Sequence, residues 1–297
     1  MKLANGQVNA AWTGAEDPVS RTSTYPREFL HQRFTYVVIS PRARGLSVGV
    51  NMNPDKRCQF SCIYCEVDRV VSPGGPELDI GAMAGELKMT LDYVRDGRLR
   101  ELHAYRKVPA ELLQLRHVAL SGDGEPTLAP RFAEALDAVM HVRAVSGLPF
   151  FKLVLITNAV ALDLPAVQRG IDRLTRQDEI WAKLDGGTPG YLSRVNGVPV
   201  PLEKILANIM ALGRKRPIII QSLFPAINGQ EPPPQEIDQY TRHLLALKEG
   251  GAQISLVQIY SATRPTPRSE CGHLPLKVLS NIAQSIRQTT GLNAEVF

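Results

Sequence analysis

Three cysteines lie close together near the start of the chain, and their types and spacing suit a metal centre. Cys58, Cys62 and Cys65 form a C-x3-C-x2-C pattern within a polar segment. Thiolates bind zinc and iron–sulfur clusters. A structural zinc site takes four ligands, whereas three cysteines on a [4Fe–4S] cluster leave one iron without a protein ligand. The pattern therefore favours a [4Fe–4S] cluster with an open iron, at which a substrate or cofactor can bind.

Two other interpretations of these cysteines stay open. A zinc site completed by Cys271 or a histidine would make the chain a non-enzymatic zinc or RNA-binding module. The C-x2-C pair would suit thiol redox chemistry if it opened a helix after a strand. The histidines show no metal-ligand spacing, and Cys271, in a polar loop, is expected to be an ordinary cysteine.

The cysteine pattern resembles the signature of the radical S-adenosylmethionine (SAM) superfamily, which has an aromatic residue where Tyr64 stands. The resemblance implies that Cys58, Cys62 and Cys65 hold a [4Fe–4S] cluster, that SAM chelates the fourth iron, and that Tyr64 lies by the adenine. It implies reductive cleavage of SAM to a 5′-deoxyadenosyl radical, which abstracts hydrogen from a substrate that the sequence does not identify. An external one-electron reductant of the flavodoxin or ferredoxin type would then be a partner.

A glycine-rich turn and a polar strand end add to this resemblance. The turn Ser121–Leu128 resembles the superfamily motif that binds the amino group of SAM through its backbone and an acid. The residues assigned to SAM on this ground are Gly122, Asp123, Gly124 and Glu125. Thr157 and Asn158, at the end of the next expected strand, would line the same site.

Further polar residues occur at later strand ends. Strand alternation places Lys183 and Asp185 on one face, where a buried lysine and acid need each other or a ligand. They are assigned to SAM or substrate, with a salt bridge under the loops as the alternative. Gln221 is assigned to SAM. Arg264 suits a substrate carboxylate or phosphate, unless it is a solvent-facing loop residue.

These residues need a scaffold that brings strand ends together. Short apolar runs predict strands at Leu46–Val50, His117–Leu120, Phe151–Ile156, Ile180–Leu184, Pro217–Leu223 and Ile254–Ile259. Helical patterns occur at Leu78–Arg95, Pro130–Arg143, Leu164–Arg173, Pro201–Leu212, Pro234–Lys248 and Pro275–Arg287. Alternating units of this kind predict a parallel α/β fold, either a partial barrel or an open sheet, with the site at the carboxyl ends of the strands. The resemblance favours a partial (βα)6 TIM-like barrel of the radical SAM type.

The resemblance and the residue pattern also suggest a division of the chain. Residues 1–35 lack periodicity and are expected to form an N-terminal arm that serves as a lid, while residues 36–297 form the core domain. The Pro-rich stretch Asn228–Pro234 is a second lid candidate.

Composition sets broad limits. The 297 residues are 44% hydrophobic and carry a formal net charge of +5. Such a chain can bury a large core, and the charge permits a tRNA partner without requiring one. No apolar run reaches the roughly 18 residues of a membrane span, and the first residues lack the apolar region of a secretory signal. We therefore expect a cytoplasmic protein without membrane contact.

Several segments resemble the branch of the superfamily related to wyosine-type tRNA-modifying enzymes. They are Ser40–Arg42, Leu46–Asn51, Ser121–Leu128, Leu155–Asn158, Lys183–Asp185 and Val257–Tyr260. Wyosine synthases use a second cluster with three further cysteines, whereas this chain has only Cys271 to spare. Wyosine-type modification of tRNA guanosine and activation of a partner protein as a glycyl radical are thus kept as alternatives.

Overall fold

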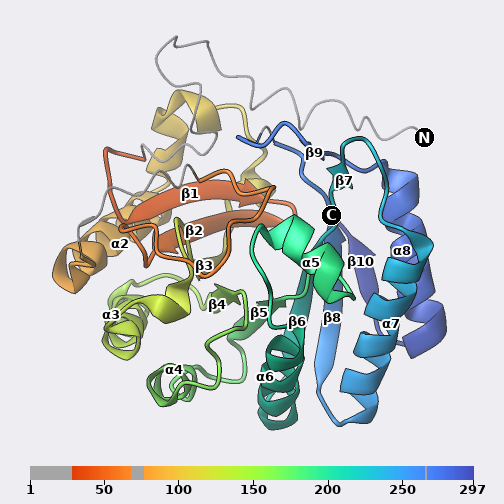
Figure 1. Ribbon diagram of the computed structural model, residues 1–297. Coiled ribbons are helices and arrows are strands. Elements are labelled where there is room, and N and C mark those ends of the chain that lie inside the picture. Colours follow the sequence, from red (N-terminus) through yellow and green to blue (C-terminus); the bar gives the residue numbers. More distant parts are fainter. Residues whose placement is uncertain (1–28, 68–76, 265) are drawn as a thin grey trace.

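In the described part of the chain, eight strands form one curled sheet in the order β1-β2-β3-β4-β5-β6-β8-β10 (Figure 1). The computed structural model describes residues 29–67, 77–264 and 266–297. The strands of this sheet are β1 Thr35–Ser40, β2 Gly45–Asn51, β3 Leu115–Ser121, β4 Lys152–Thr157, β5 Glu179–Lys183, β6 Ile218–Leu223, β8 Ile254–Tyr260 and β10 Ala294–Val296. β1 is antiparallel to β2, and every later pair is parallel.

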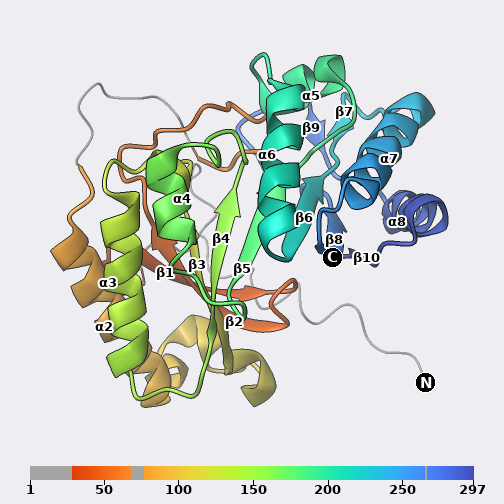
Figure 2. The same cartoon turned by 90° about the horizontal axis from the view of Figure 1, so that it is seen from below.

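Helices follow most strands and pack along the outer side of the sheet, except the short α5, which lies at the carboxyl end of the strands (Figures 1 and 2). They are α2 Ile80–Arg95, α3 Phe132–Val145, α4 Pro165–Ile171, α5 Pro189–Asn196, α6 Leu202–Lys215, α7 Pro234–Glu249 and α8 Leu276–Thr290. Short 3-10 helices lie at Arg98–Glu101, His103–Tyr105, Ala110–Leu113 and Pro126–Leu128. No helix among the described residues has the length and apolar character needed to cross a membrane.

All six expected strands are confirmed as parallel neighbours, so the partial-barrel prediction is confirmed. Their runs of Val, Ile and Leu are buried on both faces because helices cover the outer face and the curled sheet encloses the inner one. A small antiparallel pair, β7 (Ala226–Ile227) with β9 (Cys271–Gly272), was not predicted.

The expected N-terminal arm falls largely outside the described residues. The last residue of the expected arm, Thr35, is the first residue of β1. In the turn between β1 and β2, the Arg44 amide donates a hydrogen bond to the Pro41 carbonyl at 3.0 Å. The tip of this hairpin reaches the other edge of the sheet, where the Arg44 guanidinium lies 2.9 Å from the Glu295 carboxylate of β10. The second lid candidate, Asn228–Pro234, is the ordered connection between β7 and α7.

The inner face of the sheet carries its own apolar layer. Val154, Trp181 and Ile219 form a cluster separate from the main core, with Ile156 and Leu256 packed against it. These side chains come from β4, β5, β6 and β8, so they fill the middle of the partial barrel. Polar side chains lie on the same inner face at positions nearer the carboxyl ends.

Candidate functional site

The cysteine loop leaves the carboxyl end of β2 and lies against two other segments. All three cysteines are partly buried, and none of them is in a disulfide. On one side, the Glu125 amide donates to the Arg57 carbonyl at 2.9 Å. The neighbouring Gly124 permits this approach, since a Cβ there would overlap the Arg57 oxygen. The glycine-rich turn therefore supports the start of the loop.

The other side of the loop rests on the carboxyl end of α5. The amides of Ser61 and Ile63 donate to the Asn196 and Val195 carbonyls at 2.8 and 2.9 Å. These carbonyls belong to the last turn of a helix, where no intrahelical donor remains for them. Gly197 ends the helix with φ +72°, and a Cβ there would overlap the Ser61 carbonyl oxygen. The loop is thus clamped between the turn after β3 and the end of α5.

Hydrogen-bond donors lie against the sulfurs of Cys62 and Cys58. The Asn196 side-chain amide donates to Cys62 Sγ at 3.2 Å, and the Phe60 amide donates to Cys58 Sγ at 3.4 Å. The Asn158 side-chain amide lies 4.0 Å from Cys58 Sγ and 2.9 Å from the Gln59 oxygen. Such donors suit thiolate ligands, whose charge they stabilise.

The environment of Cys62 fits a bound cation centre. Burial, followed by the nearby Asp185 charge, raises the pKa of the Cys62 thiol to about 12. A thiolate at this position therefore needs a positive group against it, which a cluster iron supplies. Among the described residues, no three His, Cys, Asp or Glu side chains are placed to share one metal ion.

Glu125 is buried and serves the structure of the site. Its carboxylate accepts bonds from the Thr127 amide at 3.2 Å, the Thr127 and Thr157 hydroxyls at 2.6 Å each, and the Asn158 amide at 2.7 Å. Burial raises the pKa of this carboxyl, against the opposing effect of those donors. Three of these donors share Oε1 and one uses Oε2, so Oε2 can still accept a further hydrogen bond. Glu125 therefore joins the turn after β3 to the end of β4.

The turn is also tied to the strand that precedes the cysteine loop. The Asn51 side-chain amide donates to Asp123 at 2.8 Å, while its oxygen accepts the Asp123 and Asn53 amides at 3.1 Å each. Gly122 lies between these contacts with φ +124°. Asp123 is thereby held beside the start of the loop.

A buried ion pair lies below the cysteine loop. Lys183 Nζ is 3.2 Å from Asp185 Oδ1, and the two side chains are 15% and 1% exposed. The salt bridge between Lys183 and Asp185, which the sequence offered as one of two alternatives, is therefore present. Although burial opposes a charge on Lys183, the Asp185 carboxylate raises its pKa above the ordinary value.

Asp185 connects this pair to the loop. The Tyr64 hydroxyl and the Asn196 amide both donate to Asp185 Oδ2, the second at 3.3 Å. Oδ1 also accepts the Leu223 amide at 2.9 Å. Burial, then the Asp185 charge, raises the pKa of Tyr64 well above its ordinary value, so Tyr64 keeps its proton and donates. One carboxylate therefore orients Tyr64, Asn196 and Lys183 together.

Lys183 also faces two aromatic rings and an amide network. Its ammonium lies 4.9 Å from the Tyr64 ring centroid, 5.5 Å from that of Tyr260, and 3.1 Å from the Tyr260 hydroxyl. That hydroxyl donates to Gln221 at 3.2 Å, and Gln221 donates to Gln258 at 3.1 Å. The polar layer of the barrel interior thus begins directly under the cysteine loop.

The remaining predicted residues lie at the margin of this cluster. Arg264 Nη1 is 3.3 Å from Glu66, the residue after Cys65, so its guanidinium borders the loop. Cys271 is in β9, paired with β7, and burial raises the pKa of its thiol. The structure brings Cys58, Cys62, Cys65, Tyr64, Lys183 and Asp185 together, with the turn Gly122–Glu125 against the same loop.

Asn196 is the residue that sequence reasoning missed. It contacts both Cys62 and Asp185 from α5, a helix that was not predicted. The signal was present in the sequence, since Thr188 before Pro189 is typical of a helix start and Asn196-Gly197 of a helix end. The eight-residue length of α5 lies below the range in which hydrophobic periodicity is clear.

Comparison with known proteins adds a curated relative. No protein-family model matches the chain. The UPF0026 protein slr1464 of Synechocystis sp. is 28% identical over 233 residues, which cover 75% of this chain and 73% of that protein.

Solved structures share the architecture described above. A radical SAM methyltransferase from Sphaerobacter thermophilus has a TM-score of 0.62 at 17% identity, over 90% of this chain and 70% of its own. TYW1 with a lysine-pyruvate adduct bound has a TM-score of 0.57 at 17% identity, over 86% and 84%. SuiB of Streptococcus suis bound to S-adenosylmethionine has a TM-score of 0.53 at 13% identity, over 86% and 52%. The chain therefore shares the fold of these radical SAM structures, as the resemblance drawn from its motifs implied.

Proposed function

We propose that this protein is an enzyme that cleaves SAM reductively at a [4Fe–4S] cluster and uses the resulting radical to abstract hydrogen from a substrate. The observation that carries the proposal is the cysteine loop, which is clamped at the carboxyl end of a parallel partial barrel with donors aimed at its sulfurs. This is the end at which α/β folds place their active sites.

Cys58, Cys62 and Cys65 would hold the cluster, and the cluster would supply the electron for cleavage of the carbon–sulfur bond of SAM. The protein's own task is to bind, orient and exclude water. Asn196 and the Phe60 amide stabilise two of the thiolates through the bonds described above. Their contribution would be to keep the loop in one conformation whether the cluster is oxidised or reduced.

The turn Gly122–Glu125 and the end of β4 would bind the methionine part of SAM. Gly122, Asp123 and Gly124 offer backbone groups beside the loop, where an ammonium group needs carbonyl acceptors. Glu125 joins this turn to β4, and its Oε2, which accepts one donor in the structure, would also accept the ammonium group of SAM. Thr157 and Asn158, which donate to Glu125, complete this wall.

The polar layer beneath would bind the rest of SAM and the substrate. Tyr64 presents its ring beside the loop, and the Lys183 ammonium lies between that ring and the ring of Tyr260. Lys183 would hold a carboxylate of SAM or substrate, while Asp185 keeps Lys183 and Tyr64 in place. Gln221 adds an amide to the same layer, and Arg264 would bind an anionic substrate group at the margin.

The electron must come from outside the chain, so we include an external one-electron reductant of the flavodoxin or ferredoxin type in the proposal. The test uses protein reconstituted anaerobically with iron and sulfide, reduced with dithionite and supplied with SAM. We expect 5′-deoxyadenosine, measured by chromatography. The variant with Cys58, Cys62 and Cys65 all changed to alanine should form none, whereas Cys271→Ala, a cysteine outside the motif, should behave as the parent protein does.

Two results would count against the proposal. One is a triple cysteine variant that still carries a full complement of iron and sulfide, because the ligand assignment would then be wrong. The other is deoxyadenosine formation that is equal in the parent protein and the triple variant.

A further inference from the structure

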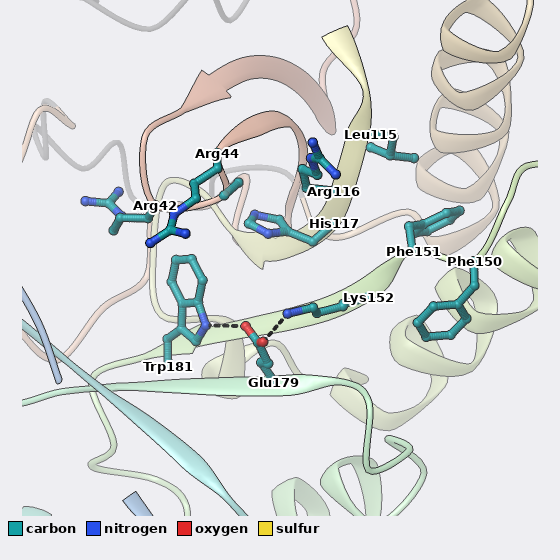
Figure 3. Close-up of a pocket in the computed structure, with 11 residues that line it drawn as sticks. Arg42, Arg44, Leu115, Arg116, His117, Phe150, Phe151, Lys152, Glu179 and Trp181 are labelled. Atoms are coloured by element: carbon teal, nitrogen blue, oxygen red, sulfur yellow. Dashed lines mark hydrogen bonds and ion pairs between the residues drawn. The ribbon is translucent and has the colours of Figure 1, made fainter. Parts of the chain in front are cut away.

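Arg42 belongs to the tip of the β1–β2 hairpin and borders a cavity at the amino end of the barrel (Figure 3). The cavity has a volume of about 480 Å³ and opens where β3, β4 and β5 begin. Its lining is cationic, with Arg42, Arg44, Arg116 and Lys152. Figure 3 shows that the Arg42 guanidinium points away from the other labelled residues. The charged end of Arg42 therefore has its partner outside this cavity.

That partner is the ring of Tyr260, at the end of β8. The guanidinium carbon lies 4.4 Å from the ring centroid, a distance at which a cation is attracted by the face of an aromatic ring. The Arg42 Nε, however, is buried and has no hydrogen-bond partner among the described residues. A buried donor without an acceptor costs about as much free energy as a ring contact contributes. The stability of the fold therefore gives no reason for an arginine at this position.

Tyr260 carries the contact into the site proposed for SAM. Its hydroxyl accepts a hydrogen bond from the Lys183 ammonium at 3.1 Å and donates one to Gln221 at 3.2 Å. An ammonium has three N–H donors on a flexible stem. The Tyr260 hydroxyl and Asp185, which is 3.2 Å from Lys183 Nζ, take two of them. These two acceptors thus set the direction of the third donor.

We propose that Arg42 is a positioning residue for SAM. By holding the Tyr260 ring in place, it fixes the hydroxyl that orients the Lys183 ammonium, whose third donor then meets the SAM carboxylate. The proposal rests on the proposed function, since it takes SAM as the ligand of Lys183. SAM is favoured over the substrate because Lys183 Nζ is 4.9 Å from the ring centroid of Tyr64, which directly precedes Cys65 in the cysteine loop.

SAM binding to the reduced, reconstituted protein tests this role without a need for turnover. The readout is the change that SAM causes in the electron paramagnetic resonance of the cluster, titrated to give an apparent dissociation constant. Arg42→Gln should weaken binding about fivefold, the effect of losing one hydrogen bond. Tyr260→Phe keeps the ring but removes the hydroxyl, so it should weaken binding by a similar factor. The double variant should bind no more weakly than Tyr260→Phe, because Arg42 acts through that hydroxyl.

Urea unfolding of the protein without cluster or SAM separates positioning from a structural role. Arg42→Gln should unfold at the urea concentration at which the parent protein unfolds, since it loses the ring contact and the unpartnered donor together. Arg42→Lys keeps a cation for the ring, so it should bind SAM within about twofold of the parent protein. Arg98→Gln is the matched control, because Arg98 lies 4.2 Å from the ring centroid of Tyr93, on the surface of α2. It should leave SAM binding unchanged.

Three results would overturn the inference while leaving the proposed function in place. They are an Arg42→Gln variant that binds SAM as tightly as the parent protein, a further loss when Arg42→Gln is added to Tyr260→Phe, and weaker binding that comes with a lower urea midpoint. A parent protein whose cluster signal does not respond to SAM would contradict the proposed function, and the role of Arg42 would fall with it.

Discussion

At the scale of single residues, Asn196 joins the cysteine loop to the buried ion pair. Its amide donates to Cys62 Sγ at 3.2 Å and to Asp185 at 3.3 Å. Reduction adds negative charge to a cluster and its thiolates, so a donor at a thiolate stabilises the reduced form more than the oxidised one. Asn196 is therefore expected to raise the reduction potential of the cluster.

Asn196→Ala should lower the midpoint potential of the cluster while the protein still binds a full complement of iron. The measurement is a redox titration followed by electron paramagnetic resonance. Arg194→Ala, an exposed change on the same helix, is the matched control and should leave the potential unchanged. Identical potentials in Asn196→Ala and the parent protein would remove the role assigned to this amide.

The Lys183–Asp185 pair permits a test of stability that is independent of catalysis. Lys183→Met should lower the free energy of unfolding by about 3 kcal/mol, because it leaves a buried carboxylate without its cation. We place the loss at the low end for a buried pair, since Asp185 keeps Tyr64, Asn196 and Leu223 as donors. Urea unfolding of Lys183→Met, Asp185→Asn and the double variant should show a double variant that loses less than the sum. Additive losses would mean that the two groups do not interact.

At the scale of elements, the cysteine loop owes its position to two supports that are remote in sequence. The turn after β3 holds Arg57, and the end of α5 holds Ser61 and Ile63. The start of α5 is itself held by Glu236 of α7, which accepts the Gly187 and Thr188 amides. A substitution that distorts the end of α5 should therefore weaken binding of the cluster, although no cysteine is changed.

Gly197→Ala tests the α5 support against a matched glycine. Gly197 and Gly229 both have positive φ, +72° and +75°, so alanine strains the backbone at either position by about 1–2 kcal/mol. Only at Gly197 would the new Cβ meet another segment, the Ser61 carbonyl, whereas it meets nothing at Gly229. Gly197→Ala should lose bound iron and sulfide on reconstitution and Gly229→Ala should not. Equal iron contents in the two variants would argue against the clamp.

The elements that could be predicted from the sequence are those with a strong local pattern. The six apolar strands and the longer helices follow from hydrophobic runs and periodicity, and the cysteine spacing identifies the loop. β10 escapes this reasoning because it is only three residues long and pairs with the distant strand β8. β1 was missed although its sequence, TYVVIS, is rich in strand-forming residues and it pairs with the next strand, β2. The hydrogen bonds of Glu125 to Thr157 and Asn158 and the contacts of Asn196 were likewise not predictable, since they depend on residues brought together only by the folded sheet.

At the scale of the whole molecule, the partial barrel holds three layers on its inner face. A polar layer with Lys183 and Gln221 lies under the cysteine loop, an apolar layer with Trp181 lies in the middle, and the cationic cavity lies at the amino end. Arg42, which lines the cavity, stacks on the ring of Tyr260, whose hydroxyl contacts Lys183 in the polar layer. This contact connects the cavity with the polar layer.

The buried His117 predicts how stability of the whole fold depends on pH. Burial, with Lys152 and Arg42 nearby, lowers its pKa to about 3, while the unfolded chain has an ordinary histidine value near 6.5. Between these values the unfolded chain binds a proton that the folded chain does not, so stability falls as pH decreases through this window. The slope from this group approaches about 1.4 kcal/mol per pH unit.

Urea unfolding of the parent protein and of His117→Asn, measured from about pH 4 to about pH 7, tests this contribution. This range covers most of the interval between the pKa of His117 in the folded chain, about 3, and its value in the unfolded chain. The variant should show a shallower dependence of the unfolding free energy on pH. His141→Asn, an exposed change on α3, is the control and should keep the parent slope. A parent slope that survives in His117→Asn would assign the pH dependence to other groups.

The central claim is that Cys58, Cys62 and Cys65 hold a [4Fe–4S] cluster to which SAM binds directly. Electron paramagnetic resonance of the reduced, reconstituted protein before and after addition of SAM tests it most directly, since no substrate is needed. We predict a cluster signal that SAM changes and that is absent from the triple alanine variant. A full, reducible cluster whose signal is the same with and without SAM would contradict the account.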